Sequence, residues 1–564
     1  MQTLPAATTS AQAVPASGAS CGCGARKPRI LLTTICRPIG PSAGDADSVG
    51  YELLHGQVTR AQGIFSPRAV HHTYGLDYIA ENITAPATVL HYPSRRELIR
   101  ELKTGRYDYA ALSFIVATFH RVKDTVALIR KHSPGTKVIL GGYGTVLPDE
   151  LLTPHADYIC REEGVGFMRR LLGEPPLEMP YRHPTIVSKL SVFSKEVSNT
   201  GMIFAGLGCP NGCDFCSTSH FFKRKHIKLL STGKQVYDVV RRYLDINPDM
   251  QFTILDEDFL LDKARAMDFR AEVQKGGVPI SIFAFSSVKA LSMYTMEELL
   301  ETGIDGFWIG YEGTRSGYGK QQGKPTPELF EEIRSSGGTI LSSMILGFDY
   351  QTKDVIRQEL DGLMALKPAL GQFLIYNFTP GTPLAERVME QGLLREEFAA
   401  DPARRHKFAT GFVSMIKHPH MSGKELQDMQ AWCFEQDYKR LGPSIYRTLE
   451  AWFNGYMKYR DSKSAYLRAK AEQWRLEIRK AYPIFLTGRL FAPNAVVRGY
   501  LANLQSRIHR EIGAPTIKER ALALLAIGAA GWTKFKLVTD TFQHPALTRN
   551  VYRQEKICCG SGAC

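Results

Sequence analysis

Three cysteines lie close together near the middle of the chain, in the run Gly208-Cys-Pro-Asn-Gly-Cys-Asp-Phe-Cys-Ser217. Cys209, Cys213 and Cys216 follow the spacing C-x3-C-x2-C. An iron–sulfur cluster is normally held by four cysteine thiolates. Three thiolates on one short loop can hold three irons of a [4Fe-4S] cluster and leave the fourth iron open, and an open coordination position is where metal chemistry takes place. The loop therefore predicts a [4Fe-4S] site with one reactive iron.

Two other interpretations of this loop remain open at the level of sequence. A zinc site would need a fourth ligand, and His220 stands at a plausible distance along the chain. Structural zinc sites usually combine two half-sites, however, and the body of the chain has no second C-x2-C pair. The cysteines could also be plain buried thiols. A disulfide framework is disfavoured in a long chain with few cysteines and no secretory signal.

Length and composition indicate a multidomain globular protein of a reducing compartment. The chain has 564 residues, of which 44% are hydrophobic and 22% charged, and its eleven cysteines are irregularly spaced. Residues 1–20 lack the basic start and apolar core of a signal peptide. The longest apolar stretch, around Ala521 to Trp532, is too short to span a bilayer. We expect a cytoplasmic protein.

The formal net charge of +14 favours an anionic partner or a solvated basic face. No nucleic-acid-binding motif accompanies the charge, so we expect no nucleic-acid partner. Basic residues near the C-terminus alternate with apolar stretches such as Pro483-Ile-Phe-Leu486 and Ala521-Leu-Ala-Leu-Leu525. Such helices can contact a membrane surface. Ordinary amphipathic helices packed on a core explain the same pattern, and that interpretation is favoured.

Strands and helices alternate from about residue 28 to residue 180, after an Ala-, Ser- and Pro-rich tail at 1–27 that we expect to be disordered. Alternation of this kind predicts a doubly wound parallel sheet. The expected strands begin near Arg29, Ala87, Tyr109, Lys137 and Tyr158. A Pro-rich segment, Pro175 to Lys195, reads as an irregular connection to the next domain.

A second alternating region, residues 195–390, predicts a partial TIM-type barrel. Six strands are expected, near 202–205, 252–255, 281–285, 306–309, 340–346 and 372–376. Such barrels place their catalytic groups at the carboxyl ends of the strands, and the cysteine loop follows the first strand. Residues 391–545 read as a helical C-terminal domain rich in aromatic residues, which we expect to serve mainly as core packing. Residues 546–564 read as a cysteine-containing tail.

The cysteine loop and the barrel together resemble the radical S-adenosylmethionine (SAM) superfamily. The resemblance implies that the three cysteines are catalytic and metal-binding, that Phe215 lies beside the adenine of SAM, and that Asp256 and Glu257, in Leu255-Asp-Glu-Asp-Phe259, bind its ammonium group. The same acidic run could simply favour a helix N-terminus. The resemblance also assigns SAM contacts to the ends of later strands, at Ser286, Ser287, Glu312 and Gly347.

The N-terminal domain resembles the cobalamin-binding domain that precedes many radical SAM barrels. Ser113 falls where that family has a serine at a strand end, and Gly141 and Gly142 fall where a double glycine lets the cofactor's nucleotide tail approach the backbone. The Asp-x-His-x-x-Gly loop of the family is absent, because residues 37–44 contain no histidine, and the lower cobalt ligand is left unassigned. A flavodoxin-like domain without a cofactor is the alternative.

The two resemblances imply an α/β enzyme with a cobalamin-binding-like domain, a radical SAM barrel and a helical C-terminal domain. The implied cofactors are a [4Fe-4S] cluster, SAM and cobalamin. The implied reaction is methylation of an unactivated carbon, in which a deoxyadenosyl radical abstracts hydrogen and methylcobalamin supplies the methyl group. The C-terminal region looks most like that of hopanoid and other lipid methylases. We therefore expect a small hydrophobic substrate and a peripheral membrane contact. The radical chemistry implies an electron donor such as a flavodoxin or ferredoxin. The alternative reaction is carbon–carbon coupling or ring formation without methyl transfer.

Overall fold

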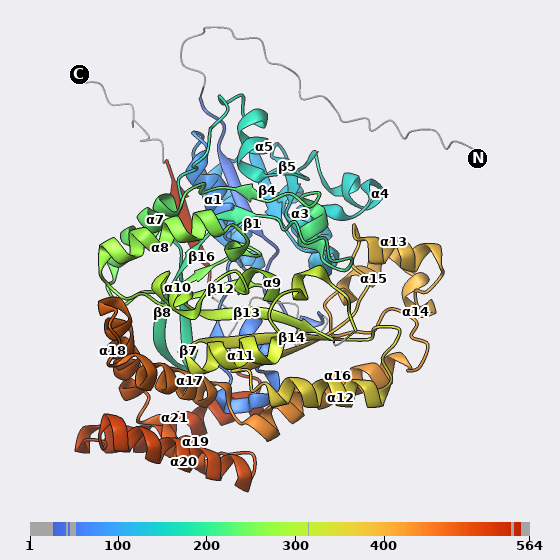
Figure 1. Cartoon of the computed structure of the whole chain (residues 1–564). Helices are drawn as coiled ribbons and strands as arrows, with labels where there is room; N and C mark the ends of the chain where they lie inside the picture. The colour runs from blue at the N-terminus through green and yellow to red at the C-terminus, as the bar shows by residue number, and fades with distance from the viewer. Residues whose placement is uncertain (1–25, 41–42, 46–51, 314, 543–545, 554–564) are drawn as a thin grey trace, which may run out of the picture.

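Three parts of the chain stack from one end of the molecule to the other in a computed structural model (Figure 1). The structure describes residues 26–40, 43–45, 52–313, 315–542 and 546–553. A parallel sheet with helices on both faces forms one end, a curled half-barrel forms the middle, and helices from the C-terminal part cover the other end. This arrangement confirms the fold class expected from the sequence. The cysteines at 21, 23, 558, 559 and 564 lie outside the described residues.

The first sheet has the strand order β16-β3-β1-β4-β5-β6, and all neighbouring strands except β16 and β3 run parallel. Its central strands are buried runs of Ile, Leu, Val and Ala, as a sheet covered on both faces requires. The strands are β1 (Ile30–Thr34), β3 (Ala87–His91), β4 (Tyr109–Ser113), β5 (Lys137–Gly141), β6 (Tyr158–Ile159) and β16 (Thr548–Tyr552). The helices between them are α1 (Gly75–Asn82), α2 (Arg95–Gly105), α3 (Phe119–His132), α4 (Asp149–Leu152) and α5 (Gly164–Leu171).

Strand β16 completes this sheet from the far end of the sequence. It runs antiparallel to β3 at the edge of the sheet, and in Figure 1 the red strand lies at the side of the N-terminal domain. Asp77 anchors it: the Asn550 side chain and the Tyr552 hydroxyl each donate to one carboxylate oxygen at 2.8 Å, while His91 lies 2.6 Å from the other. The expectation of a simple tail at 546–564 is corrected here, because part of that segment is a paired strand.

The second sheet has eight strands in the order β15-β14-β13-β12-β11-β8-β7-β2. The six strands expected from the sequence are parallel and adjacent in chain order, which is the arrangement of a partial barrel. They are β8 (Lys195–Ile203), β11 (Gln251–Ile254), β12 (Ile282–Ser286), β13 (Ile304–Glu312), β14 (Thr339–Leu346) and β15 (Leu370–Ile375). The helices associated with them are α7 (Gly233–Ile246), α8 (Lys263–Gly276), α9 (Val288–Leu291), α10 (Met296–Glu301), α11 (Thr326–Ser335), α12 (Lys353–Ala365) and α13 (Pro383–Glu390).

One edge of the half-barrel is antiparallel, which the sequence did not indicate. Strand β7 (Val187–Val192) forms a hairpin with β8, and β2 (Arg68–Ala69) adds to β7. The segment expected to be an irregular connection, 175–195, therefore contains a strand. In sequence, β2 lies between β1 and β3 of the first sheet, but in space it belongs to the second sheet. This edge therefore links the two α/β parts of the molecule.

Eight α-helices form most of the C-terminal part that the structure describes. Its aromatic residues are mostly core residues: Tyr446, Trp474, Phe453, Tyr459 and Tyr466 are all buried in clusters with barrel helices or with one another. Core packing, the favoured interpretation from the sequence, is confirmed for these five. The helices are α14 (Glu396–Ala399), α15 (Pro402–Arg405), α16 (Gly423–Leu441), α17 (Ser444–Tyr459), α18 (Ala465–Lys480), α19 (Ile484–Leu490), α20 (Ala495–Ile512) and α21 (Ile517–Val538).

Candidate active site

The cysteine loop lies between the short strand β9 (Gly206–Leu207) and helix α6 (Ser217–Phe221), beyond the carboxyl end of β8. Two glycines allow its tight path. Gly208 and Gly212 have φ of +80° and +71°, and a Cβ on Gly208 would lie 2.3 Å from the Lys225 carbonyl oxygen. Ser219 fixes the loop from inside, since its hydroxyl accepts from the Gly212 amide at 2.9 Å and donates to the Cys209 carbonyl at 2.7 Å. The backbone thus holds three thiols on one preformed turn.

The cysteine loop and the neighbouring His220 form no ready-made site for a single zinc ion. Within the described residues, no three His, Cys, Asp or Glu side chains approach closely enough to share one metal ion. The Nε2 of His220 lies 3.1 Å from the Cys213 carbonyl oxygen, so its ring is engaged with the loop backbone. Burial raises the pKa of Cys209 to about 12 and that of Cys213 to about 11. A bound metal deprotonates such thiols. We therefore expect these cysteines to become thiolates only when the cluster binds.

The acidic run at the end of β11 divides into one structural carboxylate and two that belong to the site. Asp256 is fully buried and accepts from the Ala205 amide and from Arg265, both at 2.8 Å, so its oxygens point into the protein. Glu257 is half-buried, and burial next to the Asp256 charge raises its pKa to about 7. Its charge in turn acts on Cys216, which places it beside the cysteine loop. The Glu257 carboxylate bonds to Thr218 but has no basic partner among the described residues, so it, rather than Asp256, is suited to an ammonium group.

The third carboxylate, Asp258, links the cysteine loop to the next strand. The Ser287 hydroxyl donates to it at 2.7 Å, and the Ser286 hydroxyl and the Asn211 amide group each donate at 3.4 Å. Burial raises its pKa to about 6. The two serines expected to contact ribose therefore meet at the site, but both are already bonded to Asp258.

The Gly-x-Glu motif at the end of β13 has a clear steric reason. Glu312 is buried with φ of +61°, a backbone conformation that non-glycine residues rarely adopt. A Cβ on Gly310 would lie 2.1 Å from a Glu312 carboxylate oxygen, so only glycine leaves room for this carboxylate. Glu312 forms an ion pair with Lys320, whose ammonium group lies 5.6 Å from the centre of the Phe215 ring. Burial opposes the Lys320 charge, but Glu312 and the nearby cysteines raise its pKa, so a cation is held beside the loop where an anionic cluster would need one.

The loop is also fastened to the last strands of the half-barrel. Asp214, between the second and third cysteines, accepts from the Tyr318 hydroxyl at 2.7 Å and from the Tyr376 hydroxyl at 2.5 Å. The Phe215 ring packs edge-on against both tyrosines. Gly347 ends β14 with φ of +99°, where a Cβ would lie 2.8 Å from Leu426. The carboxyl ends of strands far apart in the sheet therefore converge on one loop.

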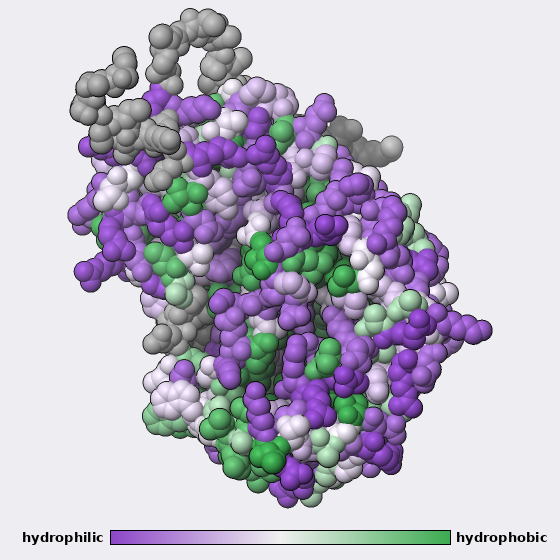
Figure 2. Space-filling view, turned by 90° about the vertical axis from the view of Figure 1, so that its left-hand side faces the viewer, coloured by the Kyte–Doolittle hydropathy of each residue, from purple (hydrophilic) through white to green (hydrophobic). Residues whose placement is uncertain are grey.

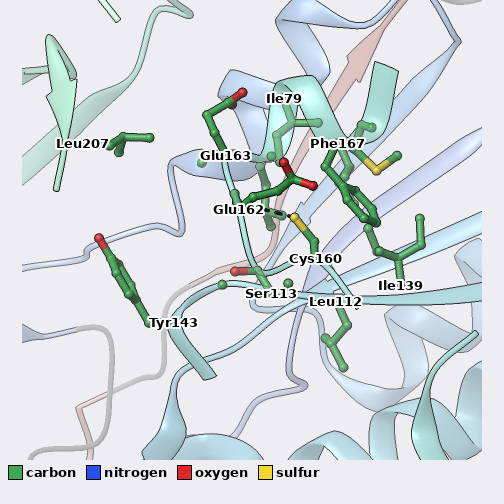
Figure 3. Close-up of a pocket in the computed structure, with 18 of the residues that line it drawn as sticks. Ile79, Leu112, Ser113, Ile139, Tyr143, Cys160, Glu162, Glu163, Phe167 and Leu207 are labelled. Atoms are coloured by element: carbon green, nitrogen blue, oxygen red, sulfur yellow. Dashed lines mark hydrogen bonds between the residues drawn. The ribbon is translucent and has the colours of Figure 1, made fainter. Parts of the chain in front are cut away.

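A cavity of about 190 Å³ opens at the carboxyl edge of the first sheet (Figure 3). Ser113, Gly141 and Gly142 all line it, as the resemblance to cobalamin-binding domains implies. Its walls are largely apolar, and the residues that line it also include Leu32, Leu112, Ile139, Cys160, Phe167 and Met168. A flat aromatic base fits a slot of this kind, because apolar side chains cover its faces and glycine leaves the backbone open. The pocket therefore suits the nucleotide tail of cobalamin.

This cavity and the cysteine loop share a wall. Leu207, two residues before Cys209, lines the cavity, and so do Phe221 and Phe222 at the end of α6. From the N-terminal domain, Tyr143 packs edge-on against both phenylalanines, at ring-centre distances of 5.1 and 6.2 Å. Figure 3 places Tyr143 and Leu207 on the same side of the cavity, facing the residues of the sheet. The segments on either side of the cysteines thus close the pocket of the other domain.

Several site residues were not identified from the sequence. Asp258 was part of the acidic run but carried no role of its own, and Asp214 stood unnoticed between two cysteines. Lys320 and Tyr318 lie in an irregular segment after β13 that shows no motif. Asp214 lies inside the cysteine motif and Asp258 inside the acidic run, and these positions were the available sequence evidence for a role.

Comparison with known proteins finds a family match for part of the N-terminal domain and a distant relative. Residues 63–172 match the family described as the B12 binding domain. The chain is 26% identical over 223 residues to the uncharacterised methyltransferase PH0819 of Pyrococcus horikoshii, an alignment that covers 37% of this chain and 48% of the relative. The chain therefore spans about half the length of that relative.

Two solved structures have similar folds at low sequence identity. One is the radical SAM methyltransferase TsrM from Kitasatospora setae with cobalamin and a [4Fe-4S] cluster bound, at a TM-score of 0.52 and 15% identity, covering 81% of this chain and all of TsrM. The other is the cobalamin-dependent SAM radical enzyme OxsB, at a TM-score of 0.50 and 13% identity, covering 92% of this chain and 84% of OxsB. The chain thus has the fold of cobalamin-dependent radical SAM enzymes, and its residues 63–172 match the B12 binding domain.

Proposed function

We propose that this protein is a cobalamin-dependent radical SAM methyltransferase that methylates an unactivated carbon. The observation that carries the proposal is the shared wall between the cobalamin-type cavity and the cysteine loop. Leu207, Phe221 and Phe222 flank the cysteines in sequence and close the cavity in space. A reaction that uses both cofactors needs them bound on adjoining parts of one protein, and this wall makes the cavity for the cobalamin tail a neighbour of the cysteine loop.

The residues present fit the three cofactors. When bound, the cluster and SAM supply a carbon radical and cobalamin supplies the methyl group, which is chemistry that no side chain provides. Cys209, Cys213 and Cys216 would hold the cluster. Glu257 offers a carboxylate to the SAM ammonium group, and Phe215 offers a ring face or edge to adenine. Lys320 balances negative charge at the loop, while Asp258 and Asp214 keep the loop in register with the strand ends.

For the substrate, we propose a hydrophobic small molecule, a lipid or terpenoid such as a hopanoid. Support comes from the exposed apolar surface of the C-terminal helices, because an enzyme that acts on a water-insoluble substrate gains from contact with an apolar phase. TsrM, in contrast, has been solved with a tryptophan substrate. We propose a flavodoxin or a ferredoxin as electron donor and a cytoplasmic location with peripheral membrane contact.

Incorporation of label from methyl-labelled SAM tests the reaction. The anaerobically reconstituted protein, supplied with cobalamin, a reductant and a lipid extract, is expected to produce 5′-deoxyadenosine and a labelled lipid. In a deletion strain, one lipid species should become lighter by a CH2 unit than in its parent. Production of 5′-deoxyadenosine together with a coupled or cyclised product that contains no label would instead favour the alternative reaction. Absence of 5′-deoxyadenosine from cluster-loaded protein would contradict both.

Glu257→Gln is expected to weaken SAM binding roughly 10- to 100-fold, because a charge-assisted hydrogen bond to an ammonium group is replaced by a neutral one. Isothermal titration with the cluster-loaded protein measures this change, and the thermal midpoint should stay close to that of the parent.

Asp256→Asn is the matched control, one residue away on the same strand end. It leaves the buried Arg265 guanidinium with only the more distant Asp262 carboxylate, at 3.9 Å, so we expect a loss of stability of about 3 kcal/mol rather than a selective loss of SAM binding. The assignment of Glu257 is wrong if its variant binds SAM like the parent while the Asp256 variant, still folded, does not.

A further inference from the structure

Helix α21 (Ile517–Val538) turns its apolar side away from the protein. By length and composition it is the one described helix that could cross a membrane, with a mean hydropathy of 1.4. Only Ala523, Ala530 and Thr533 are buried, and they lie on one narrow stripe at spacings of seven and three residues. This stripe packs against α19 and residues 60–65, and the Thr533 hydroxyl bonds to that of Ser194 at 3.1 Å. Of the large apolar side chains of the helix, Leu537 also packs against this core, whereas several others are exposed.

The outward face of α21 is continuous and apolar. Leu524 and Leu525 are 66% and 69% exposed, and Trp532 and Phe535 are 55% and 54% exposed. At 100° per residue, these four side chains share the side of the helix opposite the buried stripe. Ile517, Ala521 and Gly528 lie on the same side. We call this set the outward face. Figure 2 shows hydrophobic residues gathered at the lower end of the molecule, where the C-terminal helices lie in Figure 1.

Basic residues border the outward face on both sides. Lys518 and Lys536 lie along one edge and Arg520 lies along the other, while Lys534 lies further round the helix, next to the buried stripe. Among the described residues, none of these four forms an ion pair with a carboxylate. The helix has a single acidic residue, Glu519, and that side chain points to the protein side, where it pairs with Arg479 at 2.9 Å. The exposed part of the helix is therefore apolar in the middle and positive at both edges.

The surroundings of α21 argue against its crossing a membrane. The chain before it, α20, packs in the same cluster, and the chain after it returns to β16 in the N-terminal sheet. A spanning helix would place these two ends on opposite sides of a bilayer. The sequence analysis judged the apolar stretch at 521–532 too short to span a bilayer. The helix is longer than that stretch, at 22 residues. Its packing against α19, rather than its length, argues that it does not span a bilayer.

We propose that the outward face of α21 docks this protein in the plane of an anionic membrane surface. The apolar side chains enter the boundary between headgroups and acyl chains, and Lys518, Arg520 and Lys536 meet the anionic headgroups. Trp532 sits on this face, and tryptophan favours the bilayer interface. The net charge of +14 adds attraction over a longer range.

A second copy of the chain is a poorer occupant. In a symmetric pair built on α21, the same patch meets itself, so the rows of bases at the edges of one helix would approach those of its partner. Like charges facing each other oppose that association. An anionic membrane surface instead offers apolar contacts to the outward face and negative charges to the basic residues at its edges.

Binding to vesicles tests the proposal without any turnover, so its outcome is independent of methyl transfer. The full-length, cluster-loaded protein is expected to sediment with vesicles of equal parts phosphatidylcholine and phosphatidylglycerol, and more weakly with phosphatidylcholine alone. Of the five tryptophans, Trp532 alone is exposed, so bilayer lipids brominated on their acyl chains should quench part of the protein's fluorescence.

Two variants of α21 separate the apolar and ionic parts of the interaction. Leu524→Gln with Leu525→Gln should weaken binding to anionic vesicles about tenfold or more. Lys518→Gln with Lys536→Gln should remove most of the preference for anionic lipid and its dependence on salt. The matched control, Ile246→Gln with Val278→Gln, changes two equally exposed apolar residues elsewhere and should bind like the parent.

The proposal is overturned if the parent binds neither kind of vesicle, or if the leucine variant binds as well as the parent. It is also overturned if the leucine changes abolish a concentration-dependent dimer, measured by sedimentation velocity, and leave vesicle binding unchanged. That result would assign the outward face to a second copy of the chain.

Discussion

Cys216→Ala is expected to abolish production of 5′-deoxyadenosine and to remove most of the iron from the reconstituted protein. Two remaining thiolates cannot hold three irons of a cubane cluster, and the open iron that would bind SAM is lost with it. Iron and sulfide analysis, with absorbance and electron paramagnetic resonance spectra of the anaerobic protein, measure the cluster. Chromatography of the reaction mixture measures 5′-deoxyadenosine.

Two control variants make this result specific. Cys433→Ala removes a buried thiol in α16, which packs in an apolar cluster outside the cysteine loop, and should leave iron content unchanged. His220→Gln removes the fourth ligand that a zinc site would need and should also keep iron and activity. Tightly bound zinc that is lost in both the Cys216 and His220 variants would contradict the cluster assignment and the radical chemistry that depends on it.

Gly141→Leu is expected to abolish corrinoid binding while leaving the cluster and SAM cleavage intact. A Cβ at this position meets only the Cβ of Cys160, at 3.9 Å, so the fold accepts the first carbon. The rest of a leucine side chain would then occupy the cavity of about 190 Å³ that Gly141 lines. Corrinoid absorbance after anaerobic loading and desalting measures binding, and methyl transfer should fall to background.

Gly135→Leu is the matched control, in the exposed turn before the same strand β5. A Cβ there meets nothing within 4 Å, so this variant should bind cobalamin like the parent. Gly142 is unsuitable for the test, because its φ of +87° and a 2.8 Å approach to the Phe114 carbonyl would strain the backbone by roughly 1–2 kcal/mol or more. Full corrinoid binding by folded Gly141→Leu would place the cofactor outside this cavity.

The sequence predicted the features that depend on local spacing. The three cysteines lie within eight residues, so their association needs no knowledge of the fold. Buried parallel strands are apolar runs separated by helices. The sequence of strands and helices in each of the two α/β parts could therefore be inferred. The Gly310-x-Glu312 motif predicted a strand-end carboxylate, and the structure gives its reason in the missing Cβ of Gly310.

Features that depend on contacts between distant segments could not be predicted in this way. Strand β16 is a short polar run, Thr548–Tyr552, whose place in the first sheet is decided by Asp77, more than 470 residues earlier. The roles of Asp256 and Glu257 are opposite although they are neighbours, because successive side chains at a strand end point to opposite sides. Asp256 faces Arg265 on one side, and Glu257 faces the cysteine loop on the other.

By itself, the sequence determined the kind of chemistry, because metal ligation requires particular atoms at a short spacing and these lie on one loop. The tertiary structure alone decided that this loop closes the cobalamin-type cavity through Leu207, Phe221 and Phe222, and that α21 turns its apolar side to solvent. Both depend on which surfaces of separate elements come to face each other. That choice is made by the packing of the whole chain, in which a side chain's neighbours in space are seldom its neighbours in sequence.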